Sequence, residues 1–157
     1  MNRFSLQGQV AVVIGGTGVL GGAMARGLSA AAAAVAVVGR SALRGQAIVD
    51  DIVATGGQAI FVAADAGIRA QLVAARNTIV DRLGEPQVLL NAAGGNDPQV
   101  TVTEDLLFEA IDLTAWQQSF DLNLTAGVLL PCQVFGPPMV AAGRGSITNI
   151  ASITAHV

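Results

Sequence analysis

Short apolar runs and longer helix-forming segments alternate along the chain. The short runs, which are typical of buried β-strands, cover residues 9–14, 35–38, 59–63, 87–90 and 145–150. Between them lie segments of helix-forming composition at residues 23–33, 41–54, 68–83 and 114–130. Strands that are separated by helices need crossover connections. The pattern therefore predicts an α/β fold, with a doubly wound parallel sheet and helices on both of its faces.

Turn and cap residues mark several of the boundaries. Ser41 is placed to cap the second helix, and Gly56 followed by Gly57 is a stop signal behind it. Residues 95–112 have turn-forming composition and no sustained period. We therefore expect a long loop there, of the kind that is more often functional than idle.

The fourth predicted helix carries an apolar stripe. Trp116, Phe120, Leu124 and Val128 recur at a spacing of four, which places them on one face of a helix. Further along the chain, the consecutive prolines 137 and 138 should end any helix that reaches them, because an interior proline costs about 3 kcal/mol or more.

Composition and charge narrow the possible classes of protein. The 157 residues are 52% hydrophobic and 12% charged, which is typical of one globular domain and not of a disordered chain. The net charge is −3 and the eight basic residues, all arginines, are scattered, so we expect no nucleic-acid partner. The longest uninterrupted apolar stretch, residues 30–38, is shorter than the roughly 20 residues that span a bilayer, and nothing at the start resembles a signal peptide. We expect no membrane partner and a cytoplasmic location.

Few side chains offer acid–base or metal-binding chemistry. The sequence contains no tyrosine and no lysine, two of the common acid–base groups of enzymes. It has one histidine, His156, and one cysteine, Cys132, so it predicts no internal disulfide and no metal site. Cys132 is expected to act as a small buried hydrophobe.

A glycine-rich turn follows the first predicted strand. Gly16, Gly18 and Gly21 have the G-x-G-x-x-G spacing of the dinucleotide fingerprint, between a strand and a helix. Such a turn lets the backbone approach a pyrophosphate and directs the free N–H groups of the helix toward it. The alternative is a plain tight turn, which would not need so many glycines. The turn predicts a Rossmann-type sheet that binds a dinucleotide.

Five motifs in order resemble the short-chain dehydrogenases/reductases. They are the glycine turn at residues 15–21, Asp65 after the third strand, residues 91–94 after the fourth, Asn123 in the long helix, and residues 145–152 at the fifth strand. The resemblance implies an NAD(P)-dependent oxidoreductase, a sheet truncated here after about its fifth strand, and a homo-oligomer in the full-length family. The amino-acid sequence of residues 15–21 and 91–96 is similar to that of the D-mannonate oxidoreductase (fructuronate reductase) branch, which implies a sugar acid as the small-molecule substrate.

The same resemblance implies a set of cofactor-binding residues. They are Gly15, Thr17, Gly18, Leu20, Gly21, Arg40, Asp65, Asn91, Ala93 and Gly94. Two positions depart from the usual turn of the family: Ile14 stands at its threonine and Val19 at its middle glycine. Phosphate binding remains expected through the other glycines and the helix end, with the individual contacts left open.

The residues after the second strand bear on the choice of cofactor. A carboxylate there would bind the ribose 2′-hydroxyl of NAD, whereas an arginine favours the 2′-phosphate of NADP. Residues 39–40 supply Arg40 and no acid, so NADP is the preferred cofactor and NAD remains possible. The alternatives are that Arg40 is a solvated surface residue, that Asp65 caps a helix, and that Asn91 is a turn residue.

The catalytic residues that the resemblance implies are present only in part. The family uses a tyrosine, a lysine, a serine and an asparagine, and the last two have counterparts here in Ser152 and Asn123. The tyrosine and lysine would fall beyond Val157. Ser152 could instead cap a following element, and His156 is more simply an idle tail residue.

Three hypotheses about function follow. The chain is the N-terminal part of a short-chain oxidoreductase and is inactive alone, or a catalytically silent dinucleotide-binding module, or a truncated nonfunctional product. If it ended at Val157, its fifth strand would be an exposed apolar edge.

Overall fold

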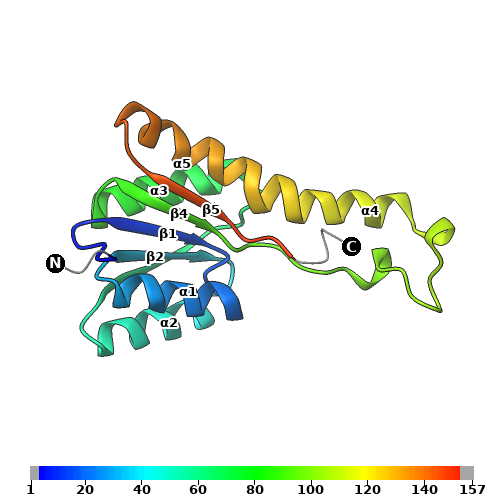
Figure 1. The fold of residues 1–157 in the computed structure, drawn as a ribbon, viewed down its shortest axis with the longest axis horizontal. Helices are drawn as coiled ribbons and strands as arrows, with labels where there is room; N and C mark the ends of the chain where they lie inside the picture. The colour runs from blue at the N-terminus through cyan, green and yellow to red at the C-terminus, as the bar shows by residue number, and fades with distance from the viewer. Residues whose placement is uncertain (1–3, 153–157) are drawn as a thin grey trace.

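The computed structural model describes residues 4–152, and the elements alternate as the apolar pattern predicts (Figure 1). The strands are β1 (Val10–Ile14), β2 (Ala34–Gly39), β3 (Gln58–Ala63), β4 (Pro86–Asn91) and β5 (Ser146–Asn149). The helices are α1 (Val19–Ala30), α2 (Ala42–Ala54), α3 (Arg69–Leu83), α4 (Leu113–Phe120) and α5 (Leu130–Ala141), with a π-helix, η3 (Asp121–Leu129), between α4 and α5. Two short 3-10 turns, η1 (Pro98–Val100) and η2 (Phe108–Ala110), lie within the predicted long loop.

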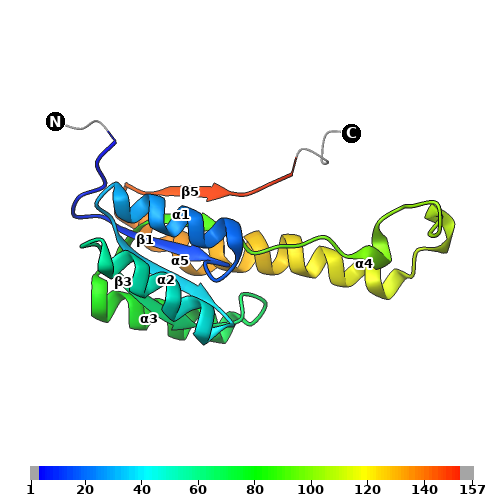
Figure 2. The same ribbon diagram turned by 90° about the horizontal axis from the view of Figure 1, so that it is seen from below.

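All five strands are parallel, in the order β3-β2-β1-β4-β5. One core cluster packs α3 and α5 on the sheet, and a second packs α1 and α2 on the opposite face. Figure 1 shows α3 and α5 on one side of the sheet and α1 and α2 on the other, and Figure 2 looks onto the side of α1 and α2. Successive residues of β1 are buried alternately in the two clusters, which explains why the strand reads as a continuous apolar run. The predicted doubly wound sheet is confirmed.

The alanine run at residues 30–34 is divided between a helix end and a strand. α1 ends at Ala30, short of the predicted residue 33, and β2 begins at Ala34. The N–H of Ala33 donates to the carbonyl of Leu28, and the N–H of Ala32 donates to that of Ser29. This is a Schellman cap, in which Ala32 takes the left-handed position with φ 73°.

The predicted fourth helix is much longer than its sequence pattern indicates. α4, η3 and α5 form one continuous helix of 29 residues, Leu113–Ala141. The prediction that prolines 137 and 138 end the helix is wrong, because α5 continues to Ala141 and the N–H of Ala142 donates to the carbonyl of Pro138. Phe135 and Met139 are buried on either side of the pair. Their packing against the sheet offsets the missing helical hydrogen bonds.

The apolar stripe of this helix does not face the core. Trp116 and Phe120 are each 42% exposed and Leu124 is 54% exposed, while Val128 is half-buried. Both views show that the α4 end of the helix projects beyond the carboxyl edge of the sheet (Figures 1 and 2). The α4 part of the stripe therefore extends past the sheet and cannot pack on it. The π-helix has more residues per turn than an α-helix, so the residues after it present a different face of the helix to the sheet.

The same helix also bears on the expectation of no membrane partner. By length and composition it could cross a bilayer, since its most apolar window has a mean hydropathy of 1.4 and only a third of that window is buried. Residues 113–141, and not residues 30–38, are therefore the segment of the described chain that is long and apolar enough to cross a bilayer. The α5 half packs on the sheet through Val134, Phe135 and Met139, as core helices of α/β domains do.

β5 lies at one edge of the five-stranded sheet. It pairs with β4, and no further strand flanks it within residues 4–152. All four of its residues are exposed, and the apolar side chain of Ile147 is 41% exposed. The other three residues of β5, Ser146, Thr148 and Asn149, are polar, so this edge is not the apolar edge that the sequence led us to expect.

The left-handed alanine at the end of α1 generates a stability prediction. Ala32→Gly should raise the free energy of unfolding by about 1 kcal/mol, because glycine has no Cβ to strain in the left-handed region. Ala30→Gly, two residues earlier and still helical, should lower it by a similar amount. Urea unfolding followed by circular dichroism measures both. Equal effects of the two substitutions would contradict the Schellman geometry.

Candidate functional site

A cleft of about 270 Å³ opens at the carboxyl edge of the sheet. The strand order reverses between β1 and β4, and ligands of open α/β sheets bind where the two crossovers diverge. The lining residues are Ile14, Gly15, Thr17, Gly18, Val38, Gly39, Arg40, Arg44, Ala64, Asp65, Ala66, Ala92, Ala93, Gly94, Leu122 and Ala126. Seven of the ten predicted cofactor-binding residues line the cleft, the exceptions being Leu20, Gly21 and Asn91.

The glycine turn is held by close backbone contacts. Gly15 has a φ of 76°, and a Cβ there would lie 2.6 Å from the nitrogen of Ala93. The N–H of Gly16 donates to the carbonyl of Val38, which ties the turn to β2. A Cβ at Gly21 would collide with the Gly15 carbonyl, so Gly21 serves the packing of α1 on the turn and not the lining of the cleft.

The start of α1 faces the cleft without a side-chain cap. Gly18 is the N-cap residue, and no side chain accepts a hydrogen bond from the first turn. The Val19 and Leu20 side chains are 91% and 62% exposed. The N–H groups of a first helical turn have no partner within the helix, and the dipole of the helix is positive at this end. Together they suit an anion such as a pyrophosphate.

Charged side chains gather where β2 and β3 end. Nη1 of Arg40 lies 3.9 Å from Oδ2 of Asp65, and the Arg40 side chain is 78% exposed. Oδ1 of Asp65 accepts a hydrogen bond from the N–H of Gly67 at 2.9 Å. Asp65 therefore forms a local turn and also lines the cleft. It does not cap α3, contrary to its alternative interpretation, because the N-cap residue of that helix is Ile68.

Arg44 is a cleft residue that sequence analysis missed. Ser41 caps α2 as predicted, its Oγ accepting from the N–H of Arg44 at 3.4 Å. The first turn of α2 brings Arg44 back to the cleft beside Arg40. A basic residue four positions after Arg40, just behind a helix cap, is the signal that could have identified it.

Asn91 lies beneath the cleft. It is 2% exposed, and its Nδ2 donates to Oδ1 of Asn149 at 2.8 Å and lies 3.5 Å from Sγ of Cys132. The carbonyl of Asn91 accepts from the N–H of Ile150. Asn91 therefore ties β4 to β5 and to α5, and a direct cofactor contact stays an expectation. Cys132 is half-buried against this amide.

Asn123 clamps the loop that follows β4. Its Oδ1 accepts from the N–H of Gly95, and its Nδ2 donates to the carbonyl of Gly95, each at 3.0 Å. Nδ2 also donates to the carbonyl of Ser119. The helix comes close enough here that a Cβ at Gly127 would lie 2.8 Å from the carbonyl oxygen of Ala93. Asn123 thus holds the cleft wall formed by Ala93 and Gly94 from behind.

The predicted catalytic residues do not line the cleft in the described part of the chain. Ser152 follows β5 at the carboxyl edge and is exposed, and Asn123 stands behind Gly94. His156 lies outside the described residues.

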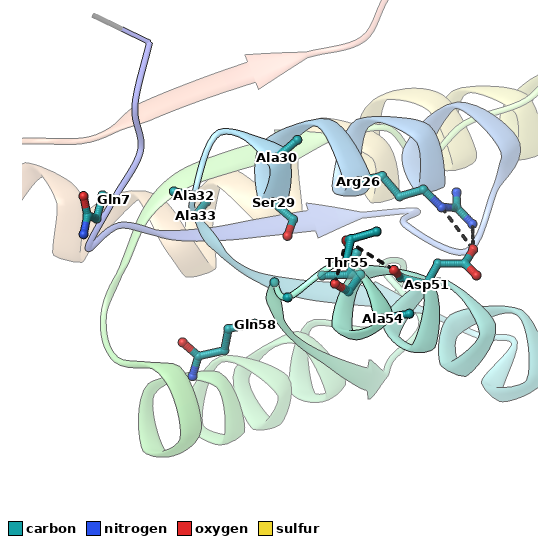
Figure 3. Close-up of a pocket in the computed structure, with 13 residues that line it drawn as sticks. Gln7, Arg26, Ser29, Ala30, Ala32, Ala33, Asp51, Ala54, Thr55 and Gln58 are labelled. Atoms are coloured by element: carbon teal, nitrogen blue, oxygen red, sulfur yellow. Dashed lines mark hydrogen bonds and ion pairs between the residues drawn. The ribbon is translucent and has the colours of Figure 1, made fainter. Parts of the chain in front are cut away.

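A larger groove of about 960 Å³ lies between the C-terminal ends of α1 and α2 (Figure 3). It is lined largely by alanines, glycines and polar side chains, and Arg26 pairs with Asp51 across it at 2.5 Å. None of the predicted cofactor-binding or catalytic residues lies in this groove. The smaller cleft, which gathers most of them, is the candidate site.

Comparison with known proteins agrees with this geometry. The sequence profile of the short chain dehydrogenase family matches residues 9–157. The chain belongs to this family. An uncharacterized oxidoreductase of Bacillus subtilis (strain 168), UxuB, is 38% identical over 160 residues, which cover 97% of this chain and 57% of the relative.

Solved short-chain dehydrogenase structures share the fold. A candidate D-mannonate oxidoreductase from Haemophilus influenza, with bound NAD, has a TM-score of 0.79 and 26% identity, covering 86% of this chain and 51% of its own. A gluconate 5-dehydrogenase from Burkholderia cenocepacia J2315, in complex with NADP and tartrate, has a TM-score of 0.86 and 28% identity, covering 99% of this chain and 58% of its own. The chain spans little more than half the length of these relatives.

The crowding at Gly15 generates a second stability prediction. Gly15→Ala should lower the free energy of unfolding by about 1–3 kcal/mol, because it combines a left-handed backbone with an overlap against the Ala93 backbone. Gly18→Ala is the matched control, since its backbone is extended and its nearest neighbour lies at 3.3 Å. Urea midpoints compare the two variants. A larger loss from Gly18→Ala would show that the turn is not built around Gly15.

Proposed function

We propose that this chain is the dinucleotide-binding part of an NAD(P)-dependent oxidoreductase. The observation that carries the proposal is the glycine turn, which brings the first turn of α1 to a cleft at the point where the strand order reverses. Relatives of the same fold hold NAD or NADP. When bound, the nicotinamide ring of such a cofactor gives or takes a hydride.

The residues present fit a dinucleotide. Gly15 and Gly18 keep side chains away from the turn, and the free N–H groups at the start of α1 suit the pyrophosphate. Asp65, Ala93 and Gly94 line the cleft, and the family resemblance supports an adenosine contact for Asp65 and a nicotinamide contact for Ala93 and Gly94. The clamp of Asn123 on Gly95 keeps that second wall in place.

The charges at the end of β2 favour NADP. Arg40 follows β2 directly and Arg44 lies one helical turn away, so two guanidinium groups line the cleft where a 2′-phosphate would be expected. Arg44 has no acidic partner among residues 4–152. Asp65 offsets only part of the charge of Arg40, because a separation of 3.9 Å between exposed groups gives a weak pair.

Proton transfer needs groups from outside these 157 residues. The sequence has no tyrosine and no lysine, and the Asn123 amide is already committed to backbone partners. Asn123 therefore acts as a positioning residue. Ser152 can orient a substrate oxygen, although a hydroxyl does not exchange its proton near neutral pH as a base of shifted pKa does.

For the substrate, we propose a sugar acid such as D-mannonate or D-fructuronate. The amino-acid sequence of residues 15–21 and 91–96 supports this choice. The structural similarity to a candidate D-mannonate oxidoreductase and to a gluconate 5-dehydrogenase supports it as well. The second candidate function is a catalytically silent dinucleotide-binding module. It is favoured by the missing tyrosine and lysine, and it predicts the same cofactor binding without turnover.

Cofactor choice is tested by titration of the purified chain. NADPH should bind more tightly than NADH, and Arg40→Ala and Arg44→Ala should each reduce that ratio by about tenfold, since each removes a charge-assisted hydrogen bond to the 2′-phosphate. Arg82→Ala, at the end of α3 and away from the cleft, is the control. Fluorescence of the reduced nicotinamide measures both affinities. Equal affinities in the wild-type chain would contradict the preference.

Turnover is tested separately. The 157-residue chain should show no measurable oxidation of D-mannonate or reduction of D-fructuronate, because the missing acid–base help alone is worth about 10²–10⁴-fold in rate. Nicotinamide absorbance at 340 nm is followed for this chain and for one extended by a family-like C-terminal half. Activity of the extended chain alone would support the enzyme over the silent module, and robust turnover by the short chain would contradict the assignment of the missing groups.

A further inference from the structure

The long helix has a wider turn where it passes the cleft. In η3 the N–H of Leu130 donates to the carbonyl of Thr125, five residues earlier, rather than to the residue four earlier. Such a bond is π-helical and places one more residue in the turn than an α-helix does. Pro131 follows directly and is buried. It has no N–H, and in an α-helix its ring would clash with the Gly127 carbonyl, so the wide turn lies where a proline excludes the α register.

The helix presents two sets of side chains, one before and one after Pro131. The cleft set faces the wall after β4 and consists of Asn123, Ala126 and Gly127. The sheet set is buried against the sheet and consists of Val134, Phe135 and Met139. At about 100° per residue, an uninterrupted α-helix would point the two sets about 100° apart around its axis. One additional residue in the turns between them cancels this difference, so the π turn lets both sets face the domain.

We propose that Pro131 is a positioning residue for the cleft: it excludes the α register, and the resulting wide turn holds Asn123 against Gly95. The inference rests on the proposed dinucleotide site and deepens it. With an ordinary residue at position 131, its N–H can donate to the Gly127 carbonyl and the helix can take the regular register. The cleft set and the sheet set would then point in different directions, and one of them would have to leave its place.

The cleft set is the one that would move. The sheet set includes Phe135 and Met139, which are only 1% and 6% exposed, whereas the hydrogen bonds of Asn123 to Gly95 are exposed. Removing two large apolar side chains from a core costs several times as much as exchanging such hydrogen bonds for bonds to water. The α4 end should therefore rotate, and the cleft wall beside Gly95 would lose its clamp.

Removal of the proline should weaken cofactor binding without lowering stability. Pro131→Ala allows the missing helical hydrogen bond and improves helix propensity, so the urea midpoint should stay the same or rise. The affinities for NADPH and NADH, measured by nicotinamide fluorescence, should each fall about tenfold, because the wall that Asn123 holds serves both cofactors. Pro137→Ala, at an exposed position of α5, is the matched control and should leave both affinities unchanged. Pro131→Val repeats the test with more of the buried volume retained.

Two further variants test the route through Asn123. In an Asn123→Ala background, Pro131→Ala should lower neither affinity further, because the clamp is already absent. Deletion of the exposed Leu129 together with Pro131→Ala gives a regular helix whose two sets are aligned again, so both affinities should return to near the wild-type values. Trp116, the only tryptophan, is partly exposed on α4. Its emission maximum should shift in Pro131→Ala and return in the deletion variant.

The outcomes separate the two proposals. The positioning role of Pro131 is overturned, while the dinucleotide site stands, if Pro131→Ala binds both cofactors as the wild type does, or if its effect is equally large in the Asn123→Ala background. It is also overturned if neither Pro131→Ala nor Pro131→Val folds, because the proline would then support the helix. If the wild-type chain binds neither cofactor, the proposed function fails, and an unshifted Trp116 emission in Pro131→Ala would show that the proline does not set the register either.

Discussion

The site depends on one close backbone contact, between the glycine turn and the segment that follows β4. Gly15 takes a left-handed conformation and lies so near the Ala92–Ala93 peptide that no Cβ fits between them. Gly21 then packs on the Gly15 carbonyl, which sets where α1 begins. Because this contact joins the ends of β1 and β4 where the strand order reverses, it also determines where the cleft opens.

The opposite wall of the cleft is held from the helix side. The Asn123 amide pairs with both backbone groups of Gly95, and Gly127 lets the helix approach the Ala93 carbonyl. Both residues lie in the π-helical segment η3, just before Pro131. Proline has no N–H, and in a regular α-helix its ring would clash with the carbonyl four residues earlier. The wider π turn accommodates the proline and brings Asn123 against the loop.

The chain carries more of the groups suited to binding a nucleotide than of the groups suited to acid–base catalysis. The groups that we propose recognise a nucleotide, namely glycines, a helix start and two arginines, lie together at one cleft. The tyrosine and lysine that the family resemblance implies for proton transfer are not among the 157 residues. Parallel strands place their carboxyl ends at one edge, so a binding cleft can form from local turns. An acid–base pair needs side chains chosen for their chemistry at particular positions.

The sequence by itself determined the order of the elements and the position of the turn. Parallel strands buried on both faces must be apolar throughout, and a turn of this shape must contain glycine, so both leave a local record. Only the tertiary structure decided how far the last helix runs, since packing of Phe135 and Met139 carries it through prolines 137 and 138. It also decided that Arg44 joins Arg40. These features depend on contacts between residues distant in the chain or one helical turn apart, and neither composition nor periodicity records such contacts.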